Sequence, residues 1–141
     1  ILVDPSADSF YNRGVFLMDI KYYKEANGDL TTSLRLNKNN AYALFYRGAS
    51  NLLLTHYNTA ISDFSEAIKF DAMDFDAYLG LAITHLKLNN TAKAKLNFDR
   101  ANAIIISSNK VSSIEQYNNT YWFHNQYYFF NNALTALAKL E

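Results

Sequence analysis

Apolar and small residues follow a helical period along most of this 141-residue chain. Around its centre they recur at intervals of three or four within two segments, at Leu44, Gly48 and Leu52 and then at Ala60, Phe64 and Ala67. Side chains at these intervals share one face of an α-helix, whereas a strand would require alternation. Poor helix formers interrupt the pattern at 55–59, and segments with Asn or Asp, which suit turns and N-caps, occupy 37–40 and 71–74. The pattern predicts a hairpin of two helices, each of about 14 residues.

This pattern returns at a fixed interval, the one that separates Gly14 from Gly48. Gly14, Gly48 and Ala82 form one series, and the others are Phe10–Leu44–Tyr78, Ala26–Ala60–Ala94, Asp29–Asp63–Asn97, Leu30–Phe64–Phe98 and Ser33–Ala67–Ala101. A repeat of this length is typical of helical solenoids, which usually present surfaces to partners. We therefore expect a single all-α domain of stacked hairpins at 7–40, 41–74 and 75–108, with 109–141 out of register.

The small residues of the repeat indicate close helix packing. A glycine inside a helix costs about 1 kcal/mol relative to alanine, so equivalent interior glycines need a packing reason. We expect Gly14 and Gly48 to face the second helix of their own hairpin. The larger Leu30 and Phe64 should then fill the space between successive hairpins.

These residues resemble the tetratricopeptide repeat (TPR) family over about 7–108. The second unit carries the resemblance best, through Tyr46-Arg47-Gly48, Tyr57, Ala60, Asp63-Phe64 and Ala67-Ile68. The sequence departs from the family at Lys38, Ala72 and Ile106, where proline is usual. The resemblance implies a right-handed superhelical stack of antiparallel hairpins, an α-solenoid.

The resemblance also implies a function, that of a non-catalytic scaffold or adaptor which binds a peptide or helix of another protein. In this family the first helix of each hairpin lines a concave groove. Carried over by register, the candidate groove residues are Tyr11, Asn12, Val15, Tyr42, Phe45, Tyr46, Ala49, Leu79 and Ile83. For Phe45, Leu53 and Ile83 the alternative is an ordinary place in the core between helices.

Some members of the family clamp the C-terminal carboxylate of a chaperone with basic and amide side chains. The corresponding positions in this sequence are Tyr11, Val15, Tyr46, Asp76 and Gly80. None of them carries a positive charge, and Asp76 would repel a carboxylate. The sequence therefore argues against binding of chaperone tails.

The segment 109–141 is rich in aromatic residues and has two explanations. It could cover the exposed face of the third hairpin as a capping helix or degenerate hairpin, because terminal repeats need a cap. It could instead form a second interface for a partner or a homodimer, through Trp122, Phe123, Tyr127 and Phe130. Self-association through this segment is thus an alternative function, and a regulatory appendage of a larger enzyme is another.

Composition and charge narrow the classes of function. The formal net charge is 0 and the charges are interspersed, which argues against electrostatic binding of nucleic acid. The sequence has no apolar run long enough to predict a membrane span, and it has no cysteine. His56, His85 and His124 lack the spacing of metal ligands, and the four glycines form no phosphate-binding loop. We expect no catalytic residue, metal or cofactor.

Overall fold

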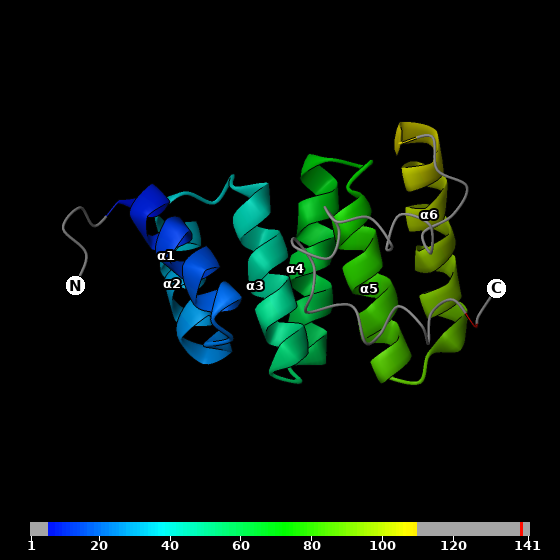
Figure 1. Cartoon of the computed structure of the whole chain (residues 1–141), viewed down its shortest axis with the longest axis horizontal. Coiled ribbons are helices and arrows are strands. Elements are labelled where there is room, and N and C mark those ends of the chain that lie inside the picture. Colours follow the sequence, from blue (N-terminus) through cyan, green and yellow to red (C-terminus); the bar gives the residue numbers. More distant parts are fainter. Residues whose placement is uncertain (1–5, 110–138, 140–141) are drawn as a thin grey trace. The chain divides into compact units, whose positions relative to one another are not determined.

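The computed structural model describes residues 6–109 and residue 139. The described part contains helices only, and their bounds are α1 Ala7–Asp19, α2 Tyr23–Leu36, α3 Ala41–Leu53, α4 Tyr57–Phe70, α5 Phe75–Lys87 and α6 Thr91–Asn109 (Figure 1). The chain divides into two compact units, Ile1–Ala72 with α1 to α4 and Met73–Glu141 with α5 and α6. Each unit is described by itself.

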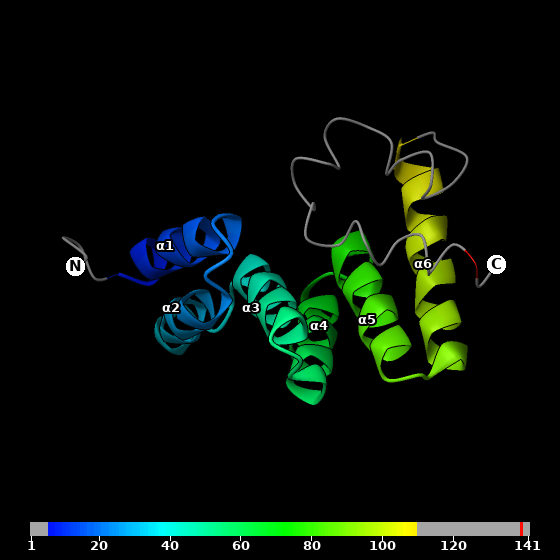
Figure 2. The same cartoon turned by 60° about the horizontal axis from the view of Figure 1, so that its bottom comes forward.

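Consecutive helices pair as hairpins, α1 with α2, α3 with α4, and α5 with α6 (Figure 2). Within the first unit α2 also packs against α3. Helices α3 and α5 begin and end one repeat interval after α1 and α3, respectively, and α4 and α6 begin one interval after α2 and α4. The prediction of an all-α chain of consecutive helical hairpins is confirmed.

Polar side chains start the first helix of each hairpin. Ser6 and Ser9 form a capping box at the start of α1. The Asn40 and Asp74 side chains accept hydrogen bonds from backbone N–H groups of the first turns of α3 and α5. These bonds satisfy donors that a helix N-terminus otherwise leaves free, which explains why the segments 37–40 and 71–74 end in Asn or Asp.

The turn inside each hairpin has the same backbone conformation. Lys21, Thr55 and Asn89, which occupy equivalent positions in the three repeats, adopt positive φ angles of 67°, 65° and 60°. At the first turn the N–H of Lys21 bonds to the carbonyl of Met18, and the N–H of Tyr22 to that of Leu17. Both other turns repeat this pair of bonds. The chain thus reverses through three Schellman motifs, although glycine is the usual residue at the left-handed position.

Glycines set the contact between the two helices of a hairpin. A Cβ atom on Gly14 would lie 2.8 Å from Cγ of Leu30, and one on Gly48 would lie 2.8 Å from Cε1 of Phe64. The prediction that these glycines face their own second helix is confirmed. Leu30 and Phe64 lie against the glycine of their own hairpin. Their expected place between successive hairpins stays a prediction. Their bulk occupies the space that the missing Cβ leaves.

The proposed cap or interface at 109–141 falls almost wholly outside the described residues. Trp122, Phe123, Tyr127 and Phe130 belong to the part that is not described, so both explanations stay predictions. Among the described helices, none has the length and apolar character needed to span a membrane.

Candidate functional site

Three tyrosines come together where α1 and α3 lie side by side in the first unit. The ring centroids of Tyr11 and Tyr46 are 6.2 Å apart in an edge-on arrangement. Tyr42 is 73% exposed, whereas Tyr11 and Tyr46 are half-buried. Burial raises the pKa of Tyr11, and the neighbouring Tyr42 raises it further. These three residues, which we call the tyrosine face, offer aromatic surface together with phenol groups.

The tyrosine face packs against buried phenylalanine rings. The Phe45 ring lies 5.3 Å from the Tyr46 ring and 5.8 Å from the Phe64 ring, measured between centroids. Phe64 is fully buried and fills the space beside Gly48. Because Tyr46 rests on this packed core, its ring is held in place.

The other candidate groove residues divide into accessible and buried ones. Asn12 is exposed and Val15 is half-buried, and both lie on α1 with Tyr11. Buried positions are Phe45, Ala49, Leu79 and Ile83, which are between 0% and 5% exposed. Leu79 and Ile83 belong to α5, in the second unit. Their assignment to a groove stays a prediction, and the accessible part of the candidate site lies in the first unit.

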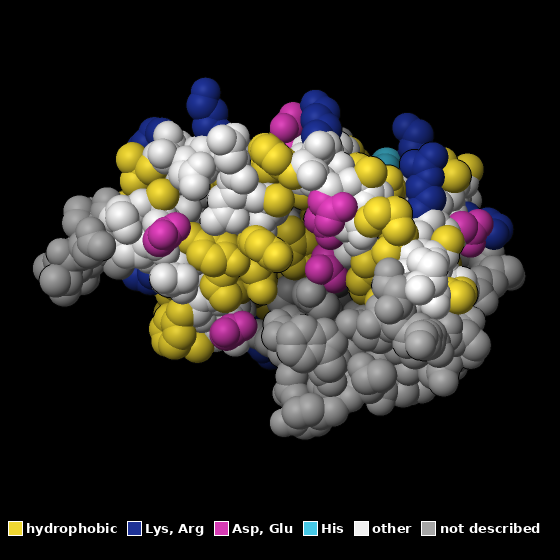
Figure 3. Space-filling view, turned by 90° about the horizontal axis from the view of Figure 1, so that it is seen from above, with side chains coloured by type: hydrophobic (Ala, Val, Ile, Leu, Met, Phe, Trp, Pro, Cys, Tyr) yellow, Lys and Arg dark blue, Asp and Glu magenta, His cyan; other side chains and the backbone are white. Residues whose placement is uncertain are grey.

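No positively charged side chain of α1 or α3 is left unpaired beside the tyrosine face. Figure 3 shows hydrophobic side chains gathered over the part of the first unit formed by α1 and α3, with single acidic side chains beside them. Asp8 and Asp19 are exposed on α1. The basic residues of α1 and α3 are Arg13 and Arg47, and each forms an ion pair with the second helix of its own hairpin.

Both ion pairs are bidentate and occupy equivalent positions in the first two repeats. Arg13 donates from Nε and Nη2 to Asp29 over 2.6 and 2.8 Å. Arg47 donates in the same way to Asp63 over 3.0 and 2.7 Å. The Asp63 side chain is only 4% exposed, compared with 11% for Asp29. Two parallel bonds of this kind fix the guanidinium plane as well as its position.

Sequence reasoning missed these pairs, although a signal was present. The aspartates were recognised as a repeating series, but their arginine partners were not paired with them. In the third repeat Leu81 stands at the arginine position and Asn97 at the aspartate position, so both charges are absent together. In the structure the Asn97 amide donates instead to the backbone carbonyl of Lys93. A joint loss of this kind indicates two residues in contact.

A polar network joins the two hairpins of the first unit. The Asn27 amide of α2 donates to Oγ of Ser50 and to Oδ1 of Asn51, over 2.8 and 2.9 Å. Asn51 in turn donates to Asp63 over 2.9 Å, so the network reaches the Arg47 ion pair. Ser50, Asn51 and Asp63 are buried. Buried polar groups are costly unless they are hydrogen-bonded, and these bonds therefore favour one register of α3 on α2.

The second unit holds one buried histidine among its described residues. His85 of α5 is 9% exposed, and its Nδ1 has no hydrogen-bond partner among the described residues. Burial lowers its pKa, and the positive charge of Lys93 lowers it further. Among the described residues, no three His, Cys, Asp or Glu side chains are grouped so that they could hold a metal ion.

Solved structures similar to this chain share its arrangement of hairpins. They include the TPR2B domain of yeast Sti1 in complex with an Hsp70 peptide, with a TM-score of 0.73 at 22% identity over 85% of this chain and 96% of that one. The first TPR domain of Spaghetti (RPAP3), bound to the HSP90 peptide SRMEEVD, gives a TM-score of 0.66 at 20% identity over 96% of this chain and 98% of that one. The chain has the tetratricopeptide-repeat fold. The Yersinia enterocolitica type III secretion chaperone SycD, in complex with a peptide of the translocator YopD, is also similar to this chain, with a TM-score of 0.71 at 14% identity over 94% of this chain and 87% of that one.

A curated relative agrees with the TPR fold. Human tetratricopeptide repeat protein 13 is 35% identical over 81 residues, which cover 57% of this chain. The match spans only 9% of the length of that relative. No family model matches the chain.

Proposed function

We propose that this TPR domain is a non-catalytic adaptor that binds an extended peptide of another protein on the tyrosine face. The observation that carries the proposal is the meeting of Tyr11, Tyr42 and Tyr46 on α1 and α3, with Tyr42 largely exposed. Aromatic residues are enriched at protein interfaces because they bury a large area at a small cost in side-chain entropy. The similar structures with bound peptides support a peptide as the partner.

The chemistry of the face favours apolar and aromatic anchors in that peptide. Tyr11 and Val15 supply apolar surface, and their neighbour Asn12 offers an amide for main-chain hydrogen bonds. The exposed acidic residue beside them, Asp8, would favour a basic residue at a flank of the peptide. We therefore expect a partner segment with apolar anchors and neutral or basic flanks.

A chaperone tail does not match this chemistry. Two of the similar structures hold chaperone peptides, and the sequence SRMEEVD of one of them is acidic at its C-terminus. Here Arg13 and Arg47 bind Asp29 and Asp63. Because α1 and α3 have no other basic residue, an acidic tail would find no free positive charge on the tyrosine face.

The proposal can be tested with peptides selected from a random display library on the whole chain. We expect the selected peptides to contain apolar anchors, and isothermal titration to show that Tyr42→Glu weakens their binding at least about tenfold, because it removes an exposed aromatic contact and adds a charge. Tyr46→Glu should do the same. Tyr22→Glu is the matched control, since Tyr22 is 57% exposed in the turn after α1, away from the face.

Three outcomes would contradict the proposal. The first is that no peptide is selected, and the second is that both substitutions on the face leave binding unchanged. The third is an equal loss of affinity in Tyr22→Glu, which would indicate a general effect of added negative charge. Micromolar binding of the peptide SRMEEVD that is lost in Tyr42→Glu but kept in Tyr22→Glu would place it on the tyrosine face and refute the argument against chaperone tails.

A further inference from the structure

A shallow cavity of about 360 Å³ lies among α2, α3 and α4 of the first unit. Its polar lining comes from Thr31 and Arg35 of α2, Lys38 just after α2, Arg47 of α3 and Glu66 of α4. None of the residues of the tyrosine face lines it. The cavity is therefore a separate feature of this unit, and its role does not depend on the function proposed above.

The charges around the cavity leave a positive excess. Arg47 is neutralised by Asp63, and Glu66 forms an ion pair with Lys69 over 2.9 Å. Within the described part of the chain, Arg35 and Lys38 are exposed and form no ion pair. The C-terminal end of α2 contributes a partial charge of only about −0.5, which these two cations exceed. The field of the cavity thus favours an anionic group.

The positive groups differ in how firmly they are held, which suits recognition of a carboxylate. Arg47 is fixed by two bonds from Nε and Nη2 to Asp63, while Nη1 makes none of the described hydrogen bonds. Arg35 lies one helical turn after Thr31, whose hydroxyl also makes no described hydrogen bond. A fixed guanidinium beside two adaptable cations provides both orientation and charge for an incoming anion.

The base of the cavity is apolar. Leu34 of α2 and Leu44 of α3 complete its lining, and both are largely buried. A small free anion would leave this surface exposed to water, whereas a peptide could cover it with an aliphatic side chain. The combination of an apolar base with cations at the edge matches a peptide in which Leu, or a similar residue, stands next to Asp or Glu.

We propose that this cavity is a second binding site, which takes an acidic peptide segment of a partner protein with an apolar residue beside its carboxylates. Arg35 and Lys38 supply the attraction, Arg47 and Thr31 supply directed donors, and Leu34 and Leu44 contact the apolar residue. The tyrosine face and this cavity would then select opposite charges, since the first is bordered by acidic residues and the second by basic ones.

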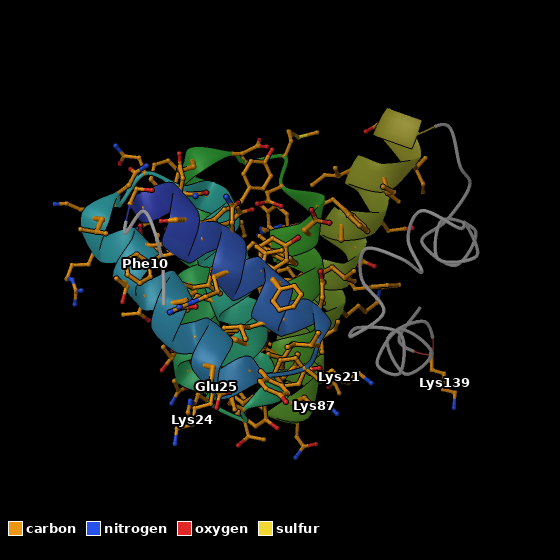
Figure 4. The ribbon with its side chains drawn as sticks, turned by 60° about the vertical axis from the view of Figure 1, so that its left-hand side comes forward. Phe10, Lys21, Lys24, Glu25, Lys87 and Lys139 are labelled. Carbon is orange, nitrogen blue, oxygen red and sulfur yellow. The ribbon has the colours of Figure 1, made fainter. Side chains whose placement is uncertain are left out.

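An NMR titration of the whole chain tests the site with a defined probe, the peptide acetyl-Leu-Glu-Glu-Leu-Glu-Glu-amide. We expect saturable shifts of backbone amide signals from residues 31–38 and 44–47. The double variant Arg35→Gln/Lys38→Gln should weaken binding at least about fivefold, because it removes both unpaired charges. Lys24→Gln is the matched control. It removes an exposed lysine in the first turn of α2, at the end opposite to Arg35, where Figure 4 shows Lys24 beside Glu25.

Each result of the titration supports or overturns the proposal. A weaker response to the same peptide with Gln in place of every Glu supports it, and so does unchanged affinity in Lys24→Gln. Equal binding of the Gln peptide would overturn the role of charge. An equal loss in Lys24→Gln, or the absence of saturable shifts, would overturn the site. Tighter binding of inorganic phosphate than of the acidic peptide would replace the proposed ligand with a phosphate group.

Discussion

Replacement of Gly48 by alanine tests whether the repeat period reflects close packing. An added Cβ would lie 2.8, 2.9 and 3.1 Å from the Cε1, Cδ1 and Cζ atoms of Phe64, whereas favourable carbon contacts lie near 3.5–4.0 Å. The Phe64 ring is fully buried and packs on Phe45, so it cannot swing into solvent. Gly28 offers a matched control, because an added Cβ there would meet nothing within 4 Å.

The comparison of the two glycines isolates the cost of the contact. Both substitutions gain about 1 kcal/mol of helix propensity, because both glycines lie inside helices. Only Gly48→Ala adds the cost of overpacking, about 1–3 kcal/mol. We expect Gly28→Ala to raise the free energy of unfolding by about 1 kcal/mol. The free energy of unfolding of Gly48→Ala should then be about 1–3 kcal/mol lower than that of Gly28→Ala.

Urea denaturation followed by circular dichroism measures this difference. With a slope of about 2 kcal/mol per molar urea, the two midpoints should differ by about 0.5–1.5 M. In a Phe64→Ala background, where no side-chain atom beyond Cβ remains to meet the new methyl group, Gly48→Ala should lose most of its cost, which a double-mutant cycle would show. The packing argument is refuted if Gly48→Ala is as stable as Gly28→Ala in the native background.

Two further predictions concern the buried polar groups. Asp63→Ala should lower the free energy of unfolding by about 3 kcal/mol, because it removes the shared partner of the half-buried Arg47 and the buried Asn51. Asp29→Ala should cost less, because both members of its ion pair are more exposed, and equal losses in urea denaturation would contradict this reasoning. The pKa of His85 lies below its ordinary value of 6.5 in the folded chain, so below about pH 6.5 the unfolded chain binds more protons and the free energy of unfolding falls as the pH falls. Denaturation series at pH 7.5 and 5.5 should show that the free energy of unfolding decreases less in His85→Leu than in the native chain. An equal decrease in both would exclude His85 as its source.

The fold could be predicted from the sequence because the features that determine it are either local, like the N-caps, or recur at the repeat interval. The interval between Gly14 and Gly48 located the hairpins, and the segments ending in Asn40 and Asp74 located the N-caps that the structure shows. The left-handed turn at Thr55 was recognised only as a break, because a β-branched residue gives no signal for positive φ. Period and caps thus predict where helices lie better than they predict how the chain turns.

The candidate site was less predictable because groove and core positions are neighbours on one helix. Tyr42, Phe45 and Tyr46 lie within a little more than one turn of α3, yet Tyr42 is 73% exposed and Phe45 is 5% exposed. Register alone cannot separate them, since the boundary between the two faces depends on how α1 packs beside α3. The edge-on contact of Tyr11 with Tyr46 likewise required coordinates, as did the cavity lined by residues from three helices.

The two hydrogen bonds from Asn27 to Ser50 and Asn51 make the first and second hairpins non-interchangeable. At the position equivalent to Asn27 in the next repeat the sequence has Ile61, whose side chain can neither donate nor accept a hydrogen bond. A tandem copy of the second hairpin would therefore set isoleucine opposite Ser50 and Asn51, which need a polar neighbour. Simple duplication of that hairpin is a poor way to lengthen this series of hairpins, whereas a graft that keeps the first and second hairpins together would preserve the match.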